Sequence, residues 1–391
     1  MSKNIVICCD GTGNGFENPD SDSNVVKLYS TLDFSGNAQV GYYHPGVGTL
    51  GNPMARNKLS SAWSVVKGLA FGSGLLDNVG DAYRFLMDAY QDGDDVYLFG
   101  FSRGAYTVRA LAGVMHMFGV LPGGNVGLIP YLLKMYAKRT RDAQRMKNTF
   151  AAADAFKTSV SRACALHFVG VWDTVSSYGW IYNPVRLPYT AQNPDMRNGR
   201  HAISIDERRC FFQKNVWGAP LEGQSIKQVW FAGVHSDVGG SYSESESGLS
   251  KITLEWMMNE AMICGLKFDA NKAQFMLGIP ATASRVTPDP AGQLHNSLTA
   301  PWWMAEFLPH KYYDEKTKGP KLRIPGGASR EIPPNSVLHQ TVLDKLNQHN
   351  GYEPKNLVEP EGLIKGCRTE PRVRPDFSSV SPLAKSTAAG I

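Results

Sequence analysis

At 391 residues, the chain is long enough for one large α/β domain with insertions, or for two domains. With 42% hydrophobic and 19% charged residues, its composition is that of an ordinary globular protein. The net charge of +5 is too small an excess of lysine and arginine to indicate nucleic-acid binding, so we expect no nucleic acid among its partners.

The first hundred residues alternate between buried strands and helical periodicity. The apolar run 4–9 predicts a buried strand that ends in a glycine-rich turn, and residues 40–43 predict a short second strand. Over residues 77–91 large apolar side chains recur at helical spacing, with Asp77 placed to cap the helix. A short buried strand over 96–99 follows.

The next part of the chain repeats this alternation. A helix rich in small residues is predicted after residue 101, and buried strands are predicted over 166–171 and 229–233. The strands are apolar throughout rather than alternating, which indicates burial on both faces. The expected fold class is therefore α/β: a mostly parallel sheet with helices on both faces and helical or loop insertions.

Domain organisation follows from changes in composition. We expect one domain over residues 1–358, with insertions near 120–160 and 268–335. The first insertion carries a basic stretch between Lys134 and Lys147, and the second carries the apolar group around Trp302 and Trp303. Residues 359–391 have scattered prolines and few large apolar side chains, so a loosely ordered C-terminal tail is expected.

The sequence GFSRG, residues 100–104, is the strongest indication of chemistry. In a nucleophile elbow, a serine occupies a strained turn between a buried strand and a helix, and small flanking residues let that turn pack closely. Both the preceding strand and the following helix are predicted here, so Ser102 is the candidate nucleophile. The alternative is an ordinary strand–helix turn in which Ser102 only caps the helix.

A serine nucleophile requires a base, and the base requires an orienting acid. A nucleophile elbow is typical of the α/β-hydrolase fold, in which the acid and then the histidine follow the serine along the chain. Asp173 and His235 each come directly after a buried strand, at the sheet edge where catalytic groups gather. Asp237 is better placed to hold the loop of His235 than to orient its ring. His295 and His44 are rivals for the base.

The glycine-rich turn after the first strand, DGTGN, is the second candidate element of the site. Together with the N–H of Arg103, the backbone N–H of Gly11 or Thr12 is expected to form an oxyanion hole. Asp10 is expected to hold the turn by accepting hydrogen bonds. A phosphate-binding loop is disfavoured because neither GxxxxGK[ST] nor GxGxxG follows the strand.

Several segments together resemble the type VI secretion phospholipase effector-like catalytic domain, a family of the α/β-hydrolase superfamily that was formerly a domain of unknown function. The resemblance rests on CCDGTGN, YYHPGVGT, the stretch ending in GFSRGAYTVRALAGVM, FVGVWDTV, IDERR, VWFAGVHSDVGGSY and YEPKNL. It implies a lipase-like hydrolase that cleaves phospholipid esters, with Ser102 as nucleophile, His235 as general base and acid, and Asp173 as orienting carboxylate. Ser241 stands where the family often has glycine, and Lys251 where it often has an acidic residue.

Two other functions remain open from the sequence. A metal-dependent phosphoester hydrolase would use Asp10, His235 and Asp237 as ligands of a divalent ion, because carboxylates suit magnesium or calcium. A non-catalytic binding protein on the same fold is the other alternative. The primary expectation needs no cofactor and no metal.

Substrate and compartment are indicated more weakly. The apolar group Trp302–Met304 with Phe307 and Leu308 is compatible with a lip for acyl chains, and also with ordinary packing. An ester or phospholipid is the expected partner, with peripheral membrane contact left open and no transmembrane segment. No signal peptide is recognised and the six cysteines show no metal-binding spacing, so we expect a protein cytoplasmic as synthesised, with signal-independent export left open.

Overall fold

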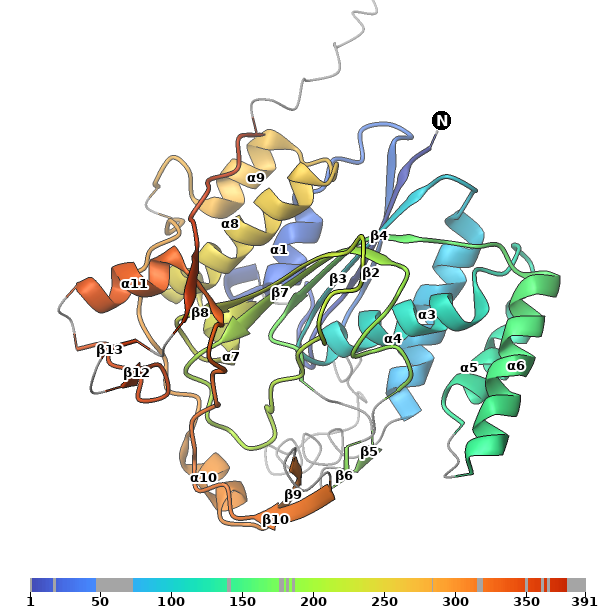
Figure 1. The fold of residues 1–391 in the computed structure, drawn as a ribbon. Coiled ribbons are helices and arrows are strands. Elements are labelled where there is room, and N and C mark those ends of the chain that lie inside the picture. The colour runs from blue at the N-terminus through green and yellow to red at the C-terminus, as the bar shows by residue number, and fades with distance from the viewer. Residues whose placement is uncertain are drawn as a thin grey trace, which may run out of the picture.

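A central eight-stranded sheet organises the molecule (Figure 1). The computed structural model describes residues 2–16, 19–46, 73–138, 142–175, 179–180, 183–184, 187–282, 284–314, 319–348, 351–359, 362–363 and 366–377. The strand order is β14-β11-β8-β7-β4-β3-β1-β2, and every neighbouring pair is parallel. The strands are β1 (Asn4–Cys9), β2 (Gln39–His44), β3 (Asp95–Phe101), β4 (Leu166–Trp172), β7 (Met196–Ser204), β8 (Ser225–Phe231), β11 (Val337–His339) and β14 (Arg368–Glu370).

Helices cover both faces of the sheet, which confirms the expected α/β class. Successive residues of β1 show how the core divides: Ile5 and Ile7 pack on one side, and Val6 and Cys8 on the other. The first side is covered by α3 (Ser73–Ala89), α4 (Ser102–Phe118), α5 (Ile129–Tyr136) and α6 (Ala143–Val160). The second is covered by α1 (Asn24–Ser30), α8 (Gly248–Ile263) and α9 (Ala270–Leu277).

Smaller elements lie at the margins of this core. They include the helices α7 (His235–Gly239), α10 (Ala300–Glu306) and α11 (Gln340–Asn347), and the short helical turns η1 (Pro19–Ser21), η2 (Val126–Leu128) and η3 (Glu244–Glu246). Three two-stranded ribbons are separate from the main sheet: β5 (Gly179–Trp180) with β6 (Asn183–Pro184), β9 (His310–Asp314) with β10 (Gly319–Arg323), and β12 (Val358–Glu359) with β13 (Gly362–Leu363). In the described residues, no helix combines the length and apolar character required to cross a bilayer.

One predicted helix differs from the structure, and a strand of the sheet was missed. Helix α3 begins at Ser73, so Asp77 lies inside the helix and is not its cap. Strand β7 was not predicted, because MRNGRHAIS carries polar residues where a buried strand is expected to be apolar. Arg200 and His201 are nevertheless buried, and the Arg200 guanidinium pairs with Glu260 of α8. A polar strand is accepted in the sheet because its buried charge finds a partner.

The C-terminal segment contributes to the sheet. Arg368–Glu370 pairs with β11 as the edge strand, and the Lys227 Nζ lies 2.7 Å from Glu370 Oε1. Phe377 is buried and its ring lies 6.1 Å from that of Phe268. Residues 366–377 of the segment expected to be loose are therefore held against the core. Residues 378–391 lie outside the described residues, as do Arg139 and Arg141 of the basic stretch.

Candidate active site

The carboxyl ends of five neighbouring strands bring the candidate residues to one edge of the sheet. Asp10 follows β1, Ser102 follows β3, Asp173 follows β4, and His235 follows β8. The fifth strand, β7, lies between β4 and β8 and ends at Ser204. Because all these strands are parallel, residues that are far apart along the chain meet at this edge.

Ser102 sits on a sharp turn between β3 and α4. Its φ of 57° is in the left-handed region, which residues with a side chain rarely adopt. The glycines on both sides leave no room for a side chain: a Cβ at Gly104 would lie 2.1 Å from the Cys9 carbonyl oxygen, and one at Gly100 would lie 2.6 Å from the Gly104 carbonyl oxygen. A Cβ on Gly11 would come within 3.1 Å of the Ser102 Cβ, so the DGTGN turn borders the serine.

His235 and Asp173 are directly joined. The His235 Nδ1 lies 2.6 Å from Asp173 Oδ2, and both residues are buried. Asp173 Oδ1 also accepts from the N–H and the hydroxyl of Ser204, at 3.0 and 3.1 Å. With Nδ1 engaged by a carboxylate, Nε2 is the ring nitrogen left to accept a proton.

Charge at this pair is set by burial and by Arg330. Burial raises the pKa of Asp173, but the Arg330 guanidinium and the hydrogen bond from His235 outweigh it and hold that pKa well below its ordinary value. Burial lowers the pKa of His235 despite the opposing effect of Asp173. The resting pair is therefore an aspartate and a neutral imidazole, which is the state that a general base requires.

Phe101 joins the serine to the histidine. Its ring lies 4.6 Å from the His235 ring, centroid to centroid, and a Cβ on Gly239 of α7 would overlap it. No hydrogen bond joins Ser102 to His235 in the described part of the chain. Catalytic hydrogen bonds often tighten only when substrate binds, so the pairing of these two residues stays a prediction.

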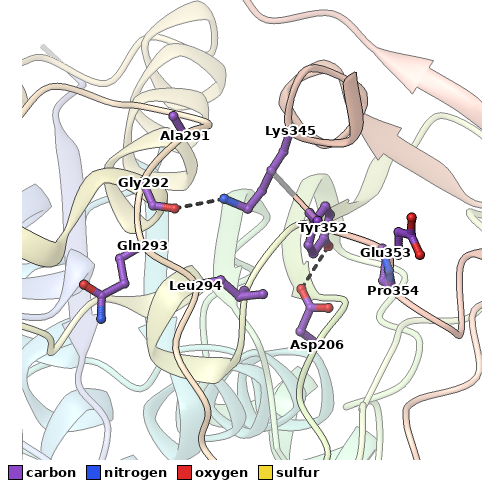
Figure 2. A pocket seen from close by; sticks show the side chains of 10 residues that line it. Asp206, Ala291, Gly292, Gln293, Leu294, Lys345, Tyr352, Glu353 and Pro354 are labelled. Carbon is purple, nitrogen blue, oxygen red and sulfur yellow. Dashed lines mark hydrogen bonds between the residues drawn. The ribbon is translucent and has the colours of Figure 1, made fainter. Parts of the chain in front are cut away.

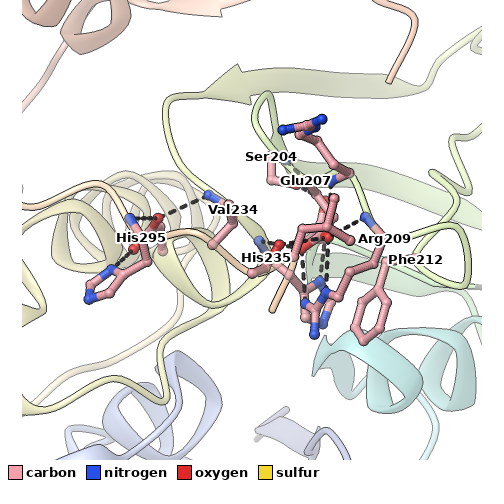
Figure 3. Close-up of polar contacts among 12 residues, drawn as sticks. Ser204, Glu207, Arg209, Phe212, Val234, His235 and His295 are labelled. Atoms are coloured by element: carbon pink, nitrogen blue, oxygen red, sulfur yellow. Dashed lines mark hydrogen bonds and ion pairs between the residues drawn. The ribbon is translucent and has the colours of Figure 1, made fainter. Parts of the chain in front are cut away.

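Glu207 is a buried residue of the site that the sequence did not single out. Its Oε2 accepts from the His235 backbone N–H at 3.2 Å and from Arg209 Nη2 at 2.9 Å (Figure 3). The Arg209 guanidinium lies over the Phe212 ring, 3.6 Å from its centroid, and that ring packs against His235 at 4.7 Å. The IDERR segment was noted only as part of the resemblance, and its spacing gives no sign of these contacts.

The DGTGN turn is built around Asp10. This carboxylate accepts from the Gly11 N–H at 2.6 Å, from Ser23 Oγ at 2.5 Å and from Tyr43 Oη at 2.9 Å, and burial raises its pKa to about 6. Because the Gly11 N–H is directed at Asp10, Thr12 is the remaining candidate of this turn for an oxyanion donor. Thr12 and Arg103 stay predictions in that role.

The rivals for the base lie elsewhere. His295 Nδ1 lies 2.6 Å from Asp237 Oδ1, and its ring stacks on Tyr242 at 3.6 Å. Asp237 also accepts from the Val234 N–H at 3.0 Å, so it ties the loop before His235 to residue 295 (Figure 3). His44 contacts Asp81 at 3.7 Å. In the part of the chain that the structure describes, neither histidine contacts Asp173.

The residues proposed for a metal site have other partners. Asp10 holds its own turn, His235 pairs with Asp173, and Asp237 pairs with His295. Among the residues that the structure describes, no three metal-ligating side chains come close enough to share an ion. In the described part of the chain, Asp10, His235 and Asp237 therefore do not form a common set of metal ligands.

A cavity of about 380 Å³ has neither Ser102 nor His235 among its lining residues (Figure 2). It is lined in part by Asp206, Lys345 and Tyr352, and Asp206 Oδ2 accepts from the Gly233 N–H at 2.7 Å and from the Tyr352 hydroxyl at 2.9 Å. Burial raises the pKa of Asp206 to about 6. The YEPKNL segment, which begins with Tyr352, therefore supports the loop that carries His235.

Helix α10 carries the apolar group of the second insertion. Some of these side chains pack beside the site, and others are exposed. The Trp302 ring packs 5.6 Å from Phe212 and is half-buried, whereas Met304 and Phe307 are 77% and 64% exposed. Buried Glu306 anchors the helix by accepting from the Cys210 N–H at 2.6 Å. The apolar group is thus partly packing and partly exposed surface next to the histidine.

Comparison with known proteins gives a family match over most of the chain. Residues 3–260 match the family described as "T6SS, Phospholipase effector Tle1-like, catalytic domain". The chain is 33% identical over 222 residues to the uncharacterized protein YEL023C of Saccharomyces cerevisiae, which is 54% of this chain and 32% of the yeast protein.

Two solved structures are also similar. An uncharacterized protein from Pseudomonas aeruginosa aligns with a TM-score of 0.40 at 20% identity, over 68% of this chain and 47% of that one. A Tle1 effector bound to the VgrG spike of the type VI secretion system aligns with a TM-score of 0.33 at 19% identity, over 64% and 53%. The chain spans about a third of the yeast relative and about half of each solved chain.

Proposed function

The chain belongs to the family of Tle1-like phospholipase effector catalytic domains, and on that basis we propose that it is a serine hydrolase of lipid carboxylic esters. The single observation that carries the proposal is the short, buried contact between His235 and Asp173 at the sheet edge where Ser102 occupies its strained turn. A phospholipid ester is the substrate that the family favours.

In the proposed reaction, His235 Nε2 takes the proton of the Ser102 hydroxyl as its oxygen attacks the ester carbonyl carbon. Asp173 stabilises the imidazolium that forms. The negative charge on the carbonyl oxygen is met by the N–H groups of Arg103, at the N-terminus of α4, and of Thr12. The imidazolium then protonates the leaving alcohol, and a water molecule activated by the same ring releases the acid from Ser102.

Contact with a lipid surface is the second part of the proposal. Leu322 and Ile324 are more than 60% exposed and follow α10 in the chain, and the Gly326 N–H donates to the Glu306 carbonyl at 3.0 Å. Exposed apolar side chains therefore come both from α10 and from the segment 322–324, which is followed by a backbone hydrogen bond to the end of α10. Such a surface suits peripheral binding to a bilayer that presents the ester.

The proposal is tested with a soluble p-nitrophenyl ester and with phospholipid vesicles. Ser102→Ala is expected to lose at least about a thousandfold of kcat, because the nucleophile is absent, and also to lose labelling by a fluorophosphonate probe. Ser250→Ala is the matched control, since its hydroxyl is also buried but donates to the Ser247 carbonyl at 3.0 Å, at the start of α8. Unchanged turnover in Ser102→Ala, or activity that a chelator abolishes, would overturn the proposal.

A further inference from the structure

The geometry points to Arg330 as a positioning residue of the catalytic pair: its guanidinium fixes the Asp173 carboxylate in the plane in which it meets His235. Arg330 lies beyond residues 3–260, so the family match does not include it. The inference rests on the proposed function and adds a residue from the C-terminal third of the chain to that site.

Both terminal nitrogens of Arg330 bind the carboxylate. Nη1 lies 2.6 Å from Asp173 Oδ1, and Nη2 lies 3.0 Å from Oδ2. Oδ2 is the same oxygen that faces His235 Nδ1 at 2.6 Å. A two-pronged contact of this kind fixes both the position and the rotation of a carboxylate, which a single hydrogen bond does not.

The same guanidinium also holds the surroundings of the pair. Nη1 donates to the Ser204 hydroxyl at 2.7 Å, and Nη2 donates to the Phe212 carbonyl at 2.5 Å. The Phe212 ring packs against His235. Arg330 therefore fixes the Asp173 carboxylate directly. Through the Phe212 carbonyl, it also fixes the residue whose ring packs against His235.

Arg330 lies in the connection between β10 and β11, outside any helix or strand, and a hydrogen bond to its backbone holds it there. Asn356 of the YEPKNL segment donates to the Arg330 carbonyl and to the Ile205 carbonyl, both at 2.9 Å. This amide joins the Arg330 loop to the end of β7. A role for the YEPKNL segment follows: it keeps the guanidinium at the sheet edge.

The charges around His235 determine how Arg330 is tested. Asp173 and Glu207 face the histidine with negative charge, and Arg209 and Arg330 balance them. Removing the Arg330 cation leaves Asp173 free to stabilise the imidazolium more strongly, so protonation of His235 becomes easier. Replacing arginine by lysine keeps the charge but loses the two-pronged contact.

The experiment measures kcat and KM for a soluble ester from pH 4 to pH 9 for the full chain. Arg330→Lys is expected to lower kcat at least about tenfold with KM within about twofold, and to leave the acid limb of the profile in place. Arg330→Gln is expected to lower kcat as much and to move the acid limb to higher pH. Arg200→Lys is the matched control, because the side chains of Arg200 and Arg330 are both 6% exposed and Arg200 pairs with Glu260 away from the site.

Two results would overturn the role of Arg330: wild-type kcat with an unmoved acid limb in both variants, or losses no larger than those of Arg200→Lys at equal thermal stability. If Arg330→Gln does not fold, the kcat and KM of Arg330→Lys decide. Ser102→Ala in the same assay separates the two proposals. If it stays active, the proposed function fails; if it is inactive while the Arg330 variants match the control, only the role of Arg330 fails.

Discussion

At the scale of single residues, the site holds its backbone in uncommon conformations. Ser102 and Asp173 have φ angles of 57° and 35°, and each such residue costs about 1–3 kcal/mol. Ser241, where the resemblance leads us to expect glycine, has a φ of 90° and donates to Asn14 Oδ1 at 3.1 Å. The close packing at Gly104 and the hydrogen bonds to Asp173 offset the cost at the two catalytic candidates.

The pH dependence of activity follows from His235. Burial lowers the pKa of this ring below its ordinary value of about 6.5, so the neutral base persists into mildly acidic solution. We expect kcat/KM for a soluble ester to fall only below about pH 6.5, along an acid limb with a single ionisation. An acid limb centred above pH 7 would contradict this assignment.

A second histidine makes folding stability depend on pH. Burial lowers the pKa of His339 to about 3, whereas in the unfolded chain it is about 6.5. The unfolded chain therefore binds an extra proton between these values, and stability is lost as pH falls below about 6.5. His339→Asn keeps a side-chain cap for α11 but does not titrate. We expect its free energy of unfolding in urea to fall about 2 kcal/mol less between pH 7 and pH 5 than that of the wild type. Equal decreases in both proteins would contradict this.

Which site residues were predictable depends on local sequence. Ser102, Asp173 and His235 each follow an apolar run, so position alone marks them as residues at a strand end. Arg330 and Glu207 join the site through contacts with residues far away in the sequence. No sequence pattern marks such contacts, so these two residues were not predicted. The pairing of Asp173 with His235 is seen in the structure, whereas that of Ser102 with His235 remains a prediction.

At the scale of elements, the contact between α4 and β1 positions the nucleophile. The first turn of α4 lies against the end of β1, where Gly104 meets the carbonyl oxygens of Cys9 and Asp10. A side chain at this point forces the helix away from the strand. Because Ser102 is the first residue of α4, any such shift also moves its hydroxyl.

Gly104→Ala is therefore expected to lower the free energy of unfolding by about 1–3 kcal/mol and to reduce kcat at least about tenfold. Gly127→Ala is the matched control, since a Cβ at Gly127 would meet no atom within 4 Å. Urea unfolding and ester turnover measure the two effects. A fully active Gly104→Ala would show that the helix does not need this close approach.

Strand β7 shows why some elements escaped prediction. Apolar runs marked β1, β3, β4 and β8, and hydropathy alone placed them in a buried sheet. In β7, the buried Arg200 and His201 depend on Glu260 and on other partners elsewhere in the chain. Such pairing exists only in the folded state, so the sequence of a polar segment like this one predicts a loop.

At the scale of the whole molecule, the C-terminal segment closes one side of the fold. Strand β14 is the last in the sheet, and Arg372 Nε lies 2.8 Å from Glu255 Oε2 of α8. The low content of large apolar residues in this segment concealed the contribution of a few. Phe377 is an example, because its side chain is only 4% exposed.

Phe377→Ala is expected to lower the free energy of unfolding by about 3 kcal/mol, because it leaves a cavity beside Phe268. Val373→Ala, at a side chain that is 50% exposed, is expected to change it by less than about 0.5 kcal/mol. Thermal and urea unfolding compare the two. Similar small changes in both would mean that the segment around Phe377 does not stabilise the core.

The position of β1 in the sheet has a consequence for biosynthesis. This strand is made before the other strands of the main sheet; both of its neighbours, β2 and β3, are made later, and β3 follows only at residues 95–101. At about 5–20 residues per second, a ribosome needs several seconds to reach β3. During that time the apolar run NIVICC has unpaired backbone on at least one side, so we expect this run to be open to incorrect strand pairing until β3 has been made.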